Sequence, residues 1–245
     1  MIDHRNVLRN ILFCCFCLMS SAHSANLEFR IQGGQGHYNM PGLHNLQTEV
    51  IAELKGMSVP VKITSNFPDF YFSRVEVLHR FSQGYTGGLS WMHMETGGRI
   101  HYADYSGEIS SDQILTCNGF GLSNTWTIMA SKCFSSTFNM PISFLWSTLD
   151  MLDEIILLDE SEVTQNELVA MGLGLDPMIS LAYKVQRLSI SIDGGYHLTF
   201  SKPFHLKDNS DAILRVNNKQ VSPDWSGYRL GVTLGYVLFS RAASN

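Results

Sequence analysis

His197 lies in the same stretch of sequence as Ser189, Ser191 and Asp193, which together are the residue types of a serine hydrolase. The apolar residues of this stretch alternate with the polar ones, so all four side chains fall on one face of a single strand. At about 3.3 Å per residue, His197 and Asp193 are then about 13 Å apart. The sequence also contains no Gly-x-Ser-x-Gly motif. We therefore expect no catalytic residues.

Metal-binding spacings are missing as well. The seven histidines beyond residue 25 form no His-Glu-x-x-His pair. Cys117 and Cys133 are the cysteines of the same region, and their separation rules out a Cys-x-x-Cys site. We expect no metal and no cofactor.

A set of charged residues recurs at positions that the alternation turns to one side of the strands. These charges have both signs, and an unpaired charge in a narrow interior would be costly, so we expect a charge network that pairs across strands and fills the interior. The alternative is a path for small polar solutes. The predicted network consists of Glu28, Arg30, Arg74, Glu76, Arg80, Asp176, Asp193 and Arg229.

The strands themselves show a period of two. Between 228 and 238 every second residue is a large apolar one, whereas the residues between them are mostly Gly, Thr or single charges. A soluble barrel would carry many Lys and Glu on its polar face; small residues instead suit the interior of a narrow membrane barrel. We expect eight antiparallel strands at 27–38, 70–82, 85–96, 108–129, 136–150, 164–184, 186–200 and 224–240.

The connections support this count. Short turns at 82–85, 130–135 and 184–186 alternate with long segments at 39–69, 97–107, 151–163 and 201–223, as in an outer-membrane barrel with both termini in the periplasm. Pro141 and Pro177 fall inside strands and require bulges.

The first long connection contains a helical pattern. Leu43, Leu46, Val50 and Leu54 share one face, with Pro41 at the start and Gly56 at the end. We expect a short amphipathic helix that caps the barrel mouth or packs on Phe67, Phe70 and Tyr71.

Tyrosines mark the outward face near its two ends. Tyr228 and Tyr236 are eight residues apart, about 20 Å of height in a tilted strand, which matches the apolar band of such barrels. The predicted interfacial aromatics are Tyr183, Tyr196, Tyr228 and Tyr236.

The start of the chain indicates export. Arg5 and Arg9 precede the apolar run 11–19, and small residues follow to Ala25, which is the order of a secretory signal peptide. We expect residues 1–25 to be removed and residues 26–245 to form one barrel domain. Loss of two basic and one acidic residue would leave 15 basic and 21 acidic residues, a net charge of −6, which excludes a nucleic-acid binder.

Three segments resemble small outer-membrane β-barrel proteins of Bacteroidota: 75–81, the runs 96–99 and 104–108, and the ending 224–231. The resemblance implies export, insertion by the barrel-assembly machinery and usually no assigned biochemical activity. The closing residues Leu234, Tyr236, Leu238 and Phe239 resemble the assembly signal of these proteins.

These observations lead to one functional hypothesis and three alternatives. We expect an outer-membrane protein of a gram-negative bacterium with a structural or surface-interaction role and no catalysis, in contact with outer-membrane lipid and lipopolysaccharide. Any partner of the external loops is unknown. An outer-membrane lipid-modifying enzyme, a small-solute channel and a soluble lipocalin-like carrier are the alternatives.

Overall fold

The computed structural model describes residues 27–38, 40–56, 62–105, 107–157 and 160–238. The predicted signal peptide at 1–25 lies outside these residues. Within the described part of the chain, no helix is both long and apolar enough to cross a membrane.

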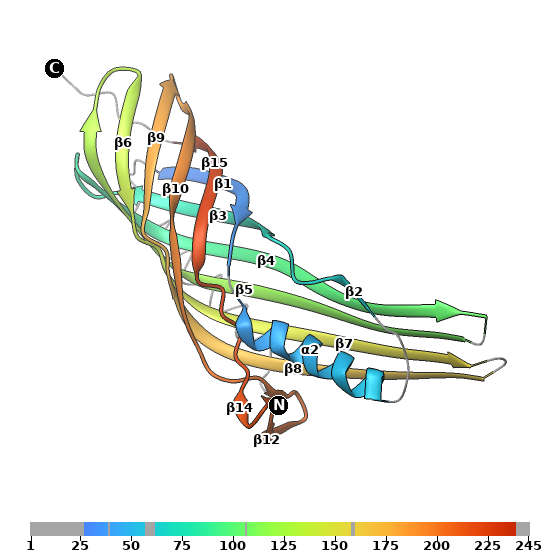
Figure 1. Ribbon diagram of the computed structural model, residues 1–245. Helices are drawn as coiled ribbons and strands as arrows, with labels where there is room; N and C mark the ends of the chain where they lie inside the picture. Colours follow the sequence, from blue (N-terminus) through green and yellow to red (C-terminus); the bar gives the residue numbers. More distant parts are fainter. Residues whose placement is uncertain (1–26, 39, 57–61, 106, 158–159, 239–245) are drawn as a thin grey trace.

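Antiparallel strands account for most of the described residues (Figure 1). The long strands are β1 (Leu27–Gly36), β3 (Phe70–Arg80), β4 (Tyr85–Asp104), β5 (Gly107–Ala130), β6 (Phe134–Asn139), β7 (Ile142–Leu157), β8 (Glu160–Leu175), β9 (Met178–Val185), β10 (Leu188–Ser201) and β15 (Gly227–Val237). The short ones are β2 (Lys62–Ser65), β11 (His205–Leu206), β12 (Asn209–Ile213), β13 (Arg215–Val216) and β14 (Lys219–Gln220), and the helix is α2 (Pro41–Gly56).

The sheet closes into a barrel because its first and last strands pair. β1 lies between β15 and β3, and β3, β4 and β5 follow as neighbours. β5 then pairs with both β6 and β7, which pair in turn with β9 and β8, and β10 joins both of these to β15. Since β6 with β7 and β8 with β9 each occupy one position in the wall, the prediction of a single eight-stranded antiparallel barrel is confirmed.

Two prolines divide these composite strands. β6 ends just before Met140 and Pro141, and β8 ends just before Asp176 and Pro177. Proline has no N–H to donate to the ladder, whereas its carbonyl can still accept. Accordingly, the Asp176 N–H bonds to the Pro141 carbonyl at 3.1 Å and the Tyr196 N–H bonds to the Pro177 carbonyl at 3.1 Å. The expected irregularities therefore occur at both prolines.

The two ends of the barrel differ strongly. Tight turns at 81–84, 131–133 and 186–187 mark one end, here called the short-turn end. At the other end β4, β5, β7 and β8 continue beyond the barrel, because β3 pairs with β4 only as far as Glu95 and β10 ends opposite Gly172. We call this part the sheet extension; it comprises 97–104, 107–114, 150–157 and 160–167 (Figure 1).

The sheet extension corrects two predictions. The segments 97–107 and 151–163 were expected to be external loops, but strand pairing continues to Asp104 with Gly107 and to Leu157 with Glu160. The outward residues of these two segments include Arg99 and Glu154. The apolar alternation of the barrel strands therefore ends here, although the backbone stays extended. The other two long connections also contain short strands: β2 pairs with β4, and β11 pairs with β8.

The predicted helix is present, with the predicted bounds. Its residues Leu43 and Leu46 are buried in one apolar cluster with Phe67 and Phe70, whereas Val50 and Leu54 are half-buried. The expected contact with Tyr71 was wrong, because that side chain is 75% exposed on the outer face.

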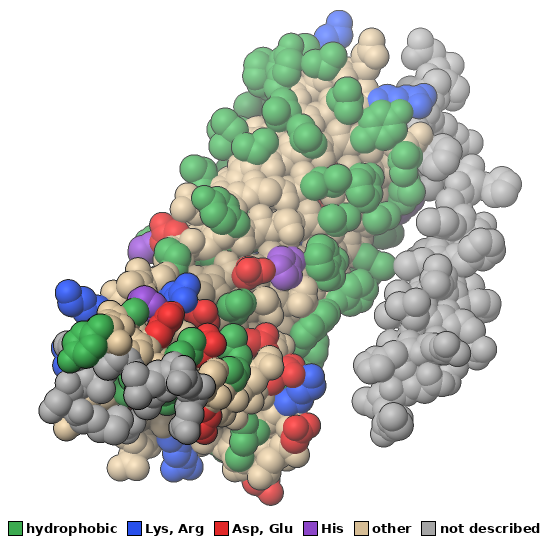
Figure 2. Space-filling model, turned by 90° about the vertical axis from the view of Figure 1, so that its right-hand side faces the viewer, with side chains coloured by type: hydrophobic (Ala, Val, Ile, Leu, Met, Phe, Trp, Pro, Cys, Tyr) green, Lys and Arg blue, Asp and Glu red, His purple; other side chains and the backbone are tan. Residues whose placement is uncertain are grey.

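The outer face of the barrel is apolar around its circumference. Figure 2 shows hydrophobic side chains spread over the upper part of one face, with most of the charged side chains gathered at its lower end. The outward residues of β10 and β15 are largely exposed, including Ile192 at 63% and Leu234 at 59%. The inward positions between them hold small or polar residues, such as Ser191 and Thr233. The alternation thus places the apolar side chains outside and the polar ones in the lumen.

Candidate functional site

An ion-paired centre crosses the lumen at the level of the proline breaks. Asp176, held by the backbone just before Pro177, accepts hydrogen bonds from Nη2 of Arg74 on β3 and from Nη1 of Arg229 on β15, the latter at 2.9 Å. All three side chains are at most 2% exposed. His197 on β10 completes the group, with its Nδ1 3.7 Å from Asp176 Oδ1. Three walls of the barrel are therefore joined through one carboxylate.

A second polar layer lies next to this centre. Asp193 accepts hydrogen bonds from Gln32 Nε2 at 3.0 Å, Ser191 Oγ at 3.0 Å and Thr233 Oγ1 at 2.5 Å. Gln32 in turn accepts from Arg74 Nη1 at 3.2 Å, which links the two layers. Buried carboxylates are stable when their oxygens are satisfied in this way.

An apolar cluster closes the lumen on the side of the sheet extension. The Arg229 guanidinium lies over the rings of Phe70 and Phe72, at 5.4 and 5.0 Å from their centroids. Above them Trp225 packs edge-on against Phe70 and donates its indole N–H to Ser147 Oγ at 3.1 Å. Leu43 of α2 belongs to the same cluster and is fully buried. We call this cluster, together with the ion-paired centre, the lumen seal.

Tyr38 ties the connection after β1 to this seal. Its ring stacks on Phe70 with centroids 5.1 Å apart, and its hydroxyl hydrogen-bonds to the Pro68 carbonyl at 2.9 Å and to Thr96 Oγ1 at 2.5 Å. Burial raises the pKa of the Tyr38 hydroxyl, so the group stays a neutral donor.

The remaining charges of the predicted network lie towards the short-turn end and are not joined to the ion-paired centre. Glu28 and Arg30 form a pair within β1, with Oε1 and Nε 2.7 Å apart. Glu76 accepts a hydrogen bond from Ser123 Oγ at 2.5 Å, and Arg80 makes no ion pair with any described residue. These side chains border a cavity of about 290 Å³. The predicted network thus falls into separate groups at different depths.

Four buried polar residues outside the predicted network follow the same sequence pattern as its members. Gln32, Ser191, Thr233 and His197 all occupy inward positions of the alternation and are buried. His197, considered above as part of a hydrolytic group, faces Asp176, whereas Ser191 bonds Asp193. The described side chains here include no serine hydrogen-bonded to a histidine, and no group of three His, Cys, Asp or Glu placed to hold a metal ion.

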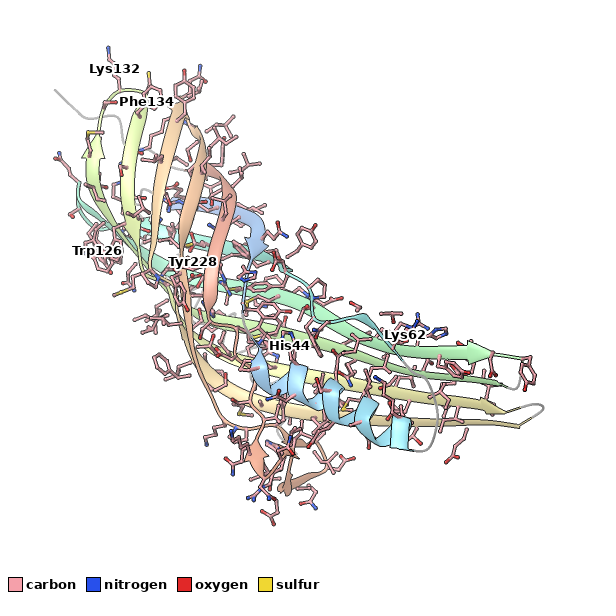
Figure 3. All side chains as sticks on the ribbon, in the orientation of Figure 1. His44, Lys62, Trp126, Lys132, Phe134 and Tyr228 are labelled. Atoms are coloured by element: carbon pink, nitrogen blue, oxygen red, sulfur yellow. The ribbon has the colours of Figure 1, made fainter. Side chains whose placement is uncertain are left out.

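The predicted interfacial tyrosines all lie on the outer face, in two groups. Tyr196 and Tyr228 are register partners whose rings meet edge-on with centroids 5.0 Å apart. Tyr183 packs on Phe134, also at 5.0 Å, and lies with Tyr236 nearer the short-turn end. Figure 3 shows Tyr228 on the barrel wall and Phe134 close to the turn that carries Lys132.

The outer face of the sheet extension carries polar pairs beside apolar side chains such as Ile114, Leu152 and Val163. Arg99 and Asp112 bond across β4 and β5 at 3.1 Å, and His101 and Glu108 do so at 3.0 Å. On the opposite edge Lys207 bonds Glu167 at 2.6 Å, and this hydrogen bond raises the pKa of the Lys207 ammonium. The surface beyond the apolar band is therefore suited to water.

Comparisons with known proteins find similar folds but no shared family. No protein-family model and no curated protein matches the sequence. Among solved structures, the chain is similar to Neisserial surface protein A (NspA; 9% identity, TM-score 0.40), covering 86% of this chain and 97% of that one. It is also similar to Ail, the attachment invasion locus protein of Yersinia pestis (10%, 0.30, covering 86% and 99%). A third similar structure is a major outer membrane protein from Thermus thermophilus (12%, 0.42, covering 86% and 99%). Since all three TM-scores are below 0.5, we base the fold on the strand pairing alone.

Proposed function

We propose that the protein is an integral outer-membrane β-barrel of a gram-negative bacterium. The observation that carries the proposal is the outer face of the closed barrel, where large apolar side chains such as Ile192 and Leu234 are more than half exposed. Such a continuous apolar belt is stable only in contact with lipid. The short-turn end then faces the periplasm and the sheet extension faces the outside, with outer-membrane lipid and lipopolysaccharide around the barrel.

Its role in this proposal is structural or surface-interacting, without catalysis. The lumen seal supports a barrel that does not conduct, because Trp225, Phe70 and the Asp176 centre fill it. Binding would then take place on the sheet extension and on the segment 201–223, which stand clear of the lipid. The Bacteroidota type and insertion by the barrel-assembly machinery, both implied by the sequence resemblance, are further parts of the proposal.

Fractionation and gel mobility test the membrane proposal. We expect the mature chain to begin near residues 23–26, to fractionate with outer membranes, and to migrate faster on a gel when unheated than after boiling. A soluble periplasmic pool that needs no detergent would refute the proposal and favour a soluble carrier.

Two further assays test the inactive, sealed role. The purified protein should leave lipid A and phospholipids unchanged and should give no stable conductance in planar bilayers. Turnover of either lipid would indicate an enzyme, and a stable conductance would indicate a channel.

A further inference from the structure

A cavity lined mostly by polar side chains lies inside the barrel at the short-turn end. Its volume is about 290 Å³, which is close to the lower limit of ordinary small-molecule sites. Its walls come from opposite sides of the barrel, its inner end is formed by the Asp193 layer, and Gln186 and Arg187 of the β9–β10 turn stand at its mouth. A small solute can therefore enter only from the short-turn end, because the lumen seal lies behind the Asp193 layer.

The acidic side chains of this cavity are already satisfied by the wall. Glu28 is paired with Arg30, Glu76 accepts from Ser123, and Asp193 accepts from three donors. The donors to Glu76 and Asp193 are neutral, so both carboxylates keep their charge, and the cavity lining carries four basic and three acidic side chains, a net charge of +1.

The basic side chains are not satisfied to the same extent. Arg80, Lys184 and Arg187 line the cavity, and the described residues supply no ion-pair or hydrogen-bond partner for their side-chain nitrogens. Arg80 on β3 and Lys184 on β9 come from opposite walls of the barrel and line the same cavity. Three cationic groups thus converge on one opening.

The wall of the cavity near the short-turn end contains a buried hydroxyl without a hydrogen-bond partner. Ser135 is 4% exposed and lines the cavity, yet its buried Oγ makes no hydrogen bond. A buried hydroxyl without a partner is rare in folded proteins and indicates a ligand or water at this point. Thr86 and Thr125 add two more hydroxyl groups to the same wall.

We propose that this cavity binds the phosphate group of a small polar molecule. Arg80 on one side of the cavity and Lys184 and Arg187 on the other present positive groups from two directions to an anion with several free oxygens, and charge-assisted hydrogen bonds of this kind are the strong ones. The hydroxyl groups of the wall formed by β4, β5 and β6 bind the polar remainder of the molecule. Two sources carry this chemistry: a soluble sugar phosphate and the headgroup of a phospholipid. The site itself does not depend on the proposed membrane orientation; only its assignment to the periplasmic side does.

Calorimetric titration in an uncharged polyoxyethylene detergent tests the site. The probes are glucose 6-phosphate, glucose, and the water-soluble lipids dihexanoyl phosphatidylglycerol and dihexanoyl phosphatidylcholine. Arg80→Gln and Lys184→Gln should each weaken binding of the phosphate probe by about tenfold or more, the usual effect of losing one charge-assisted bond. Lys132→Gln is the matched control, since Lys132 lies exposed in the β5–β6 turn at the same end (Figure 3) and does not line the cavity.

The outcomes separate the two sources. Binding of glucose 6-phosphate but not of glucose supports a soluble phosphate, and binding of phosphatidylglycerol but not of phosphatidylcholine supports a lipid headgroup. Binding that neither cavity variant weakens, or that Lys132→Gln weakens equally, overturns the proposal, as does the absence of binding. Each variant is first checked for its heat-dependent gel shift, so that failure of this site and failure of the membrane proposal are distinguished.

Discussion

Replacement of Asp176 by Asn should destabilise the barrel more than any single change of a surface charge. Asp176 is 1% exposed and accepts hydrogen bonds from two buried guanidinium groups, those of Arg74 and Arg229. A hydrogen bond to a charged group contributes about 1.5–3 kcal/mol, so two of them contribute about 3–6 kcal/mol. Removal of one partner of a buried ion pair typically costs about 3–5 kcal/mol, which agrees. We therefore expect a loss of about 3 kcal/mol or more in the free energy of unfolding.

Equilibrium unfolding in urea, with the protein reconstituted in lipid vesicles and followed by tryptophan fluorescence and gel mobility, measures this loss. Glu162→Gln is the control, because Glu162 is exposed on the sheet extension and its removal should change stability by no more than about 0.5 kcal/mol. Equal stability of the two variants would show that the Asp176 centre does not hold the walls together. The contacts that hold the walls together would then be those of the apolar cluster alone.

Three other predictions concern the faces, the close approaches and the outer segments. Leu234→Arg should cost about 2–4 kcal/mol if Leu234 lies near the middle of the bilayer, whereas Thr233→Ser, which keeps the hydroxyl bonded to Asp193, should be mild; equal effects in urea unfolding would mean that the faces are reversed. Gly227→Ala should cost about 1–3 kcal/mol, because a Cβ there would collide with the His37 carbonyl oxygen, whereas the nearest atom at Gly194 is 4.0 Å away, so that Gly194→Ala should lose less stability in the same assay. Deletion of 207–212, an exposed tip, should leave the heat-dependent gel shift intact. Val216→Asp should instead lower the temperature at which the gel shift occurs, because Val216 is 5% exposed within the apolar cluster. Loss of the gel shift after the deletion would mean that the tip supports the barrel.

The wall of the barrel could be predicted from sequence because its outer residues face one solvent throughout. Except at Gly194, every second residue of β10 and β15 is large and apolar, and the inward residues are mostly small or polar, so both the strands and their faces follow from the period of two. The same reasoning failed at 97–107 and 151–163. There the outward positions hold Arg99 and Glu154 as well as Leu152, so the period of two no longer separates an apolar face from a polar one.

For the candidate site, the sequence could predict which residues face the lumen but not which of them pair. Alternation identifies Arg74, Asp176 and Arg229 as inward, but it does not say which carboxylate meets which guanidinium. That depends on the stagger between strands that are not neighbours, and Asp176 lies 102 residues from Arg74 along the chain. The burial of Val216 could not be predicted from the sequence for a related reason. It belongs to a polar segment and is buried only because the short strand β13 folds back onto the apolar cluster.

The unequal strand lengths determine what another cell or molecule can reach. On β5 the outer residues beyond Ile114 are polar from Asp112, and the strand continues from there to Gly107, which at about 3.3 Å per residue is about 17 Å of backbone. Tyr105, in the turn that follows β4, is fully exposed at the tip of this span. In the proposed orientation the tip stands among the sugar chains of lipopolysaccharide instead of at the lipid surface. Any partner would therefore reach the tip within the carbohydrate layer, and long sugar chains would cover the tip that short chains leave accessible.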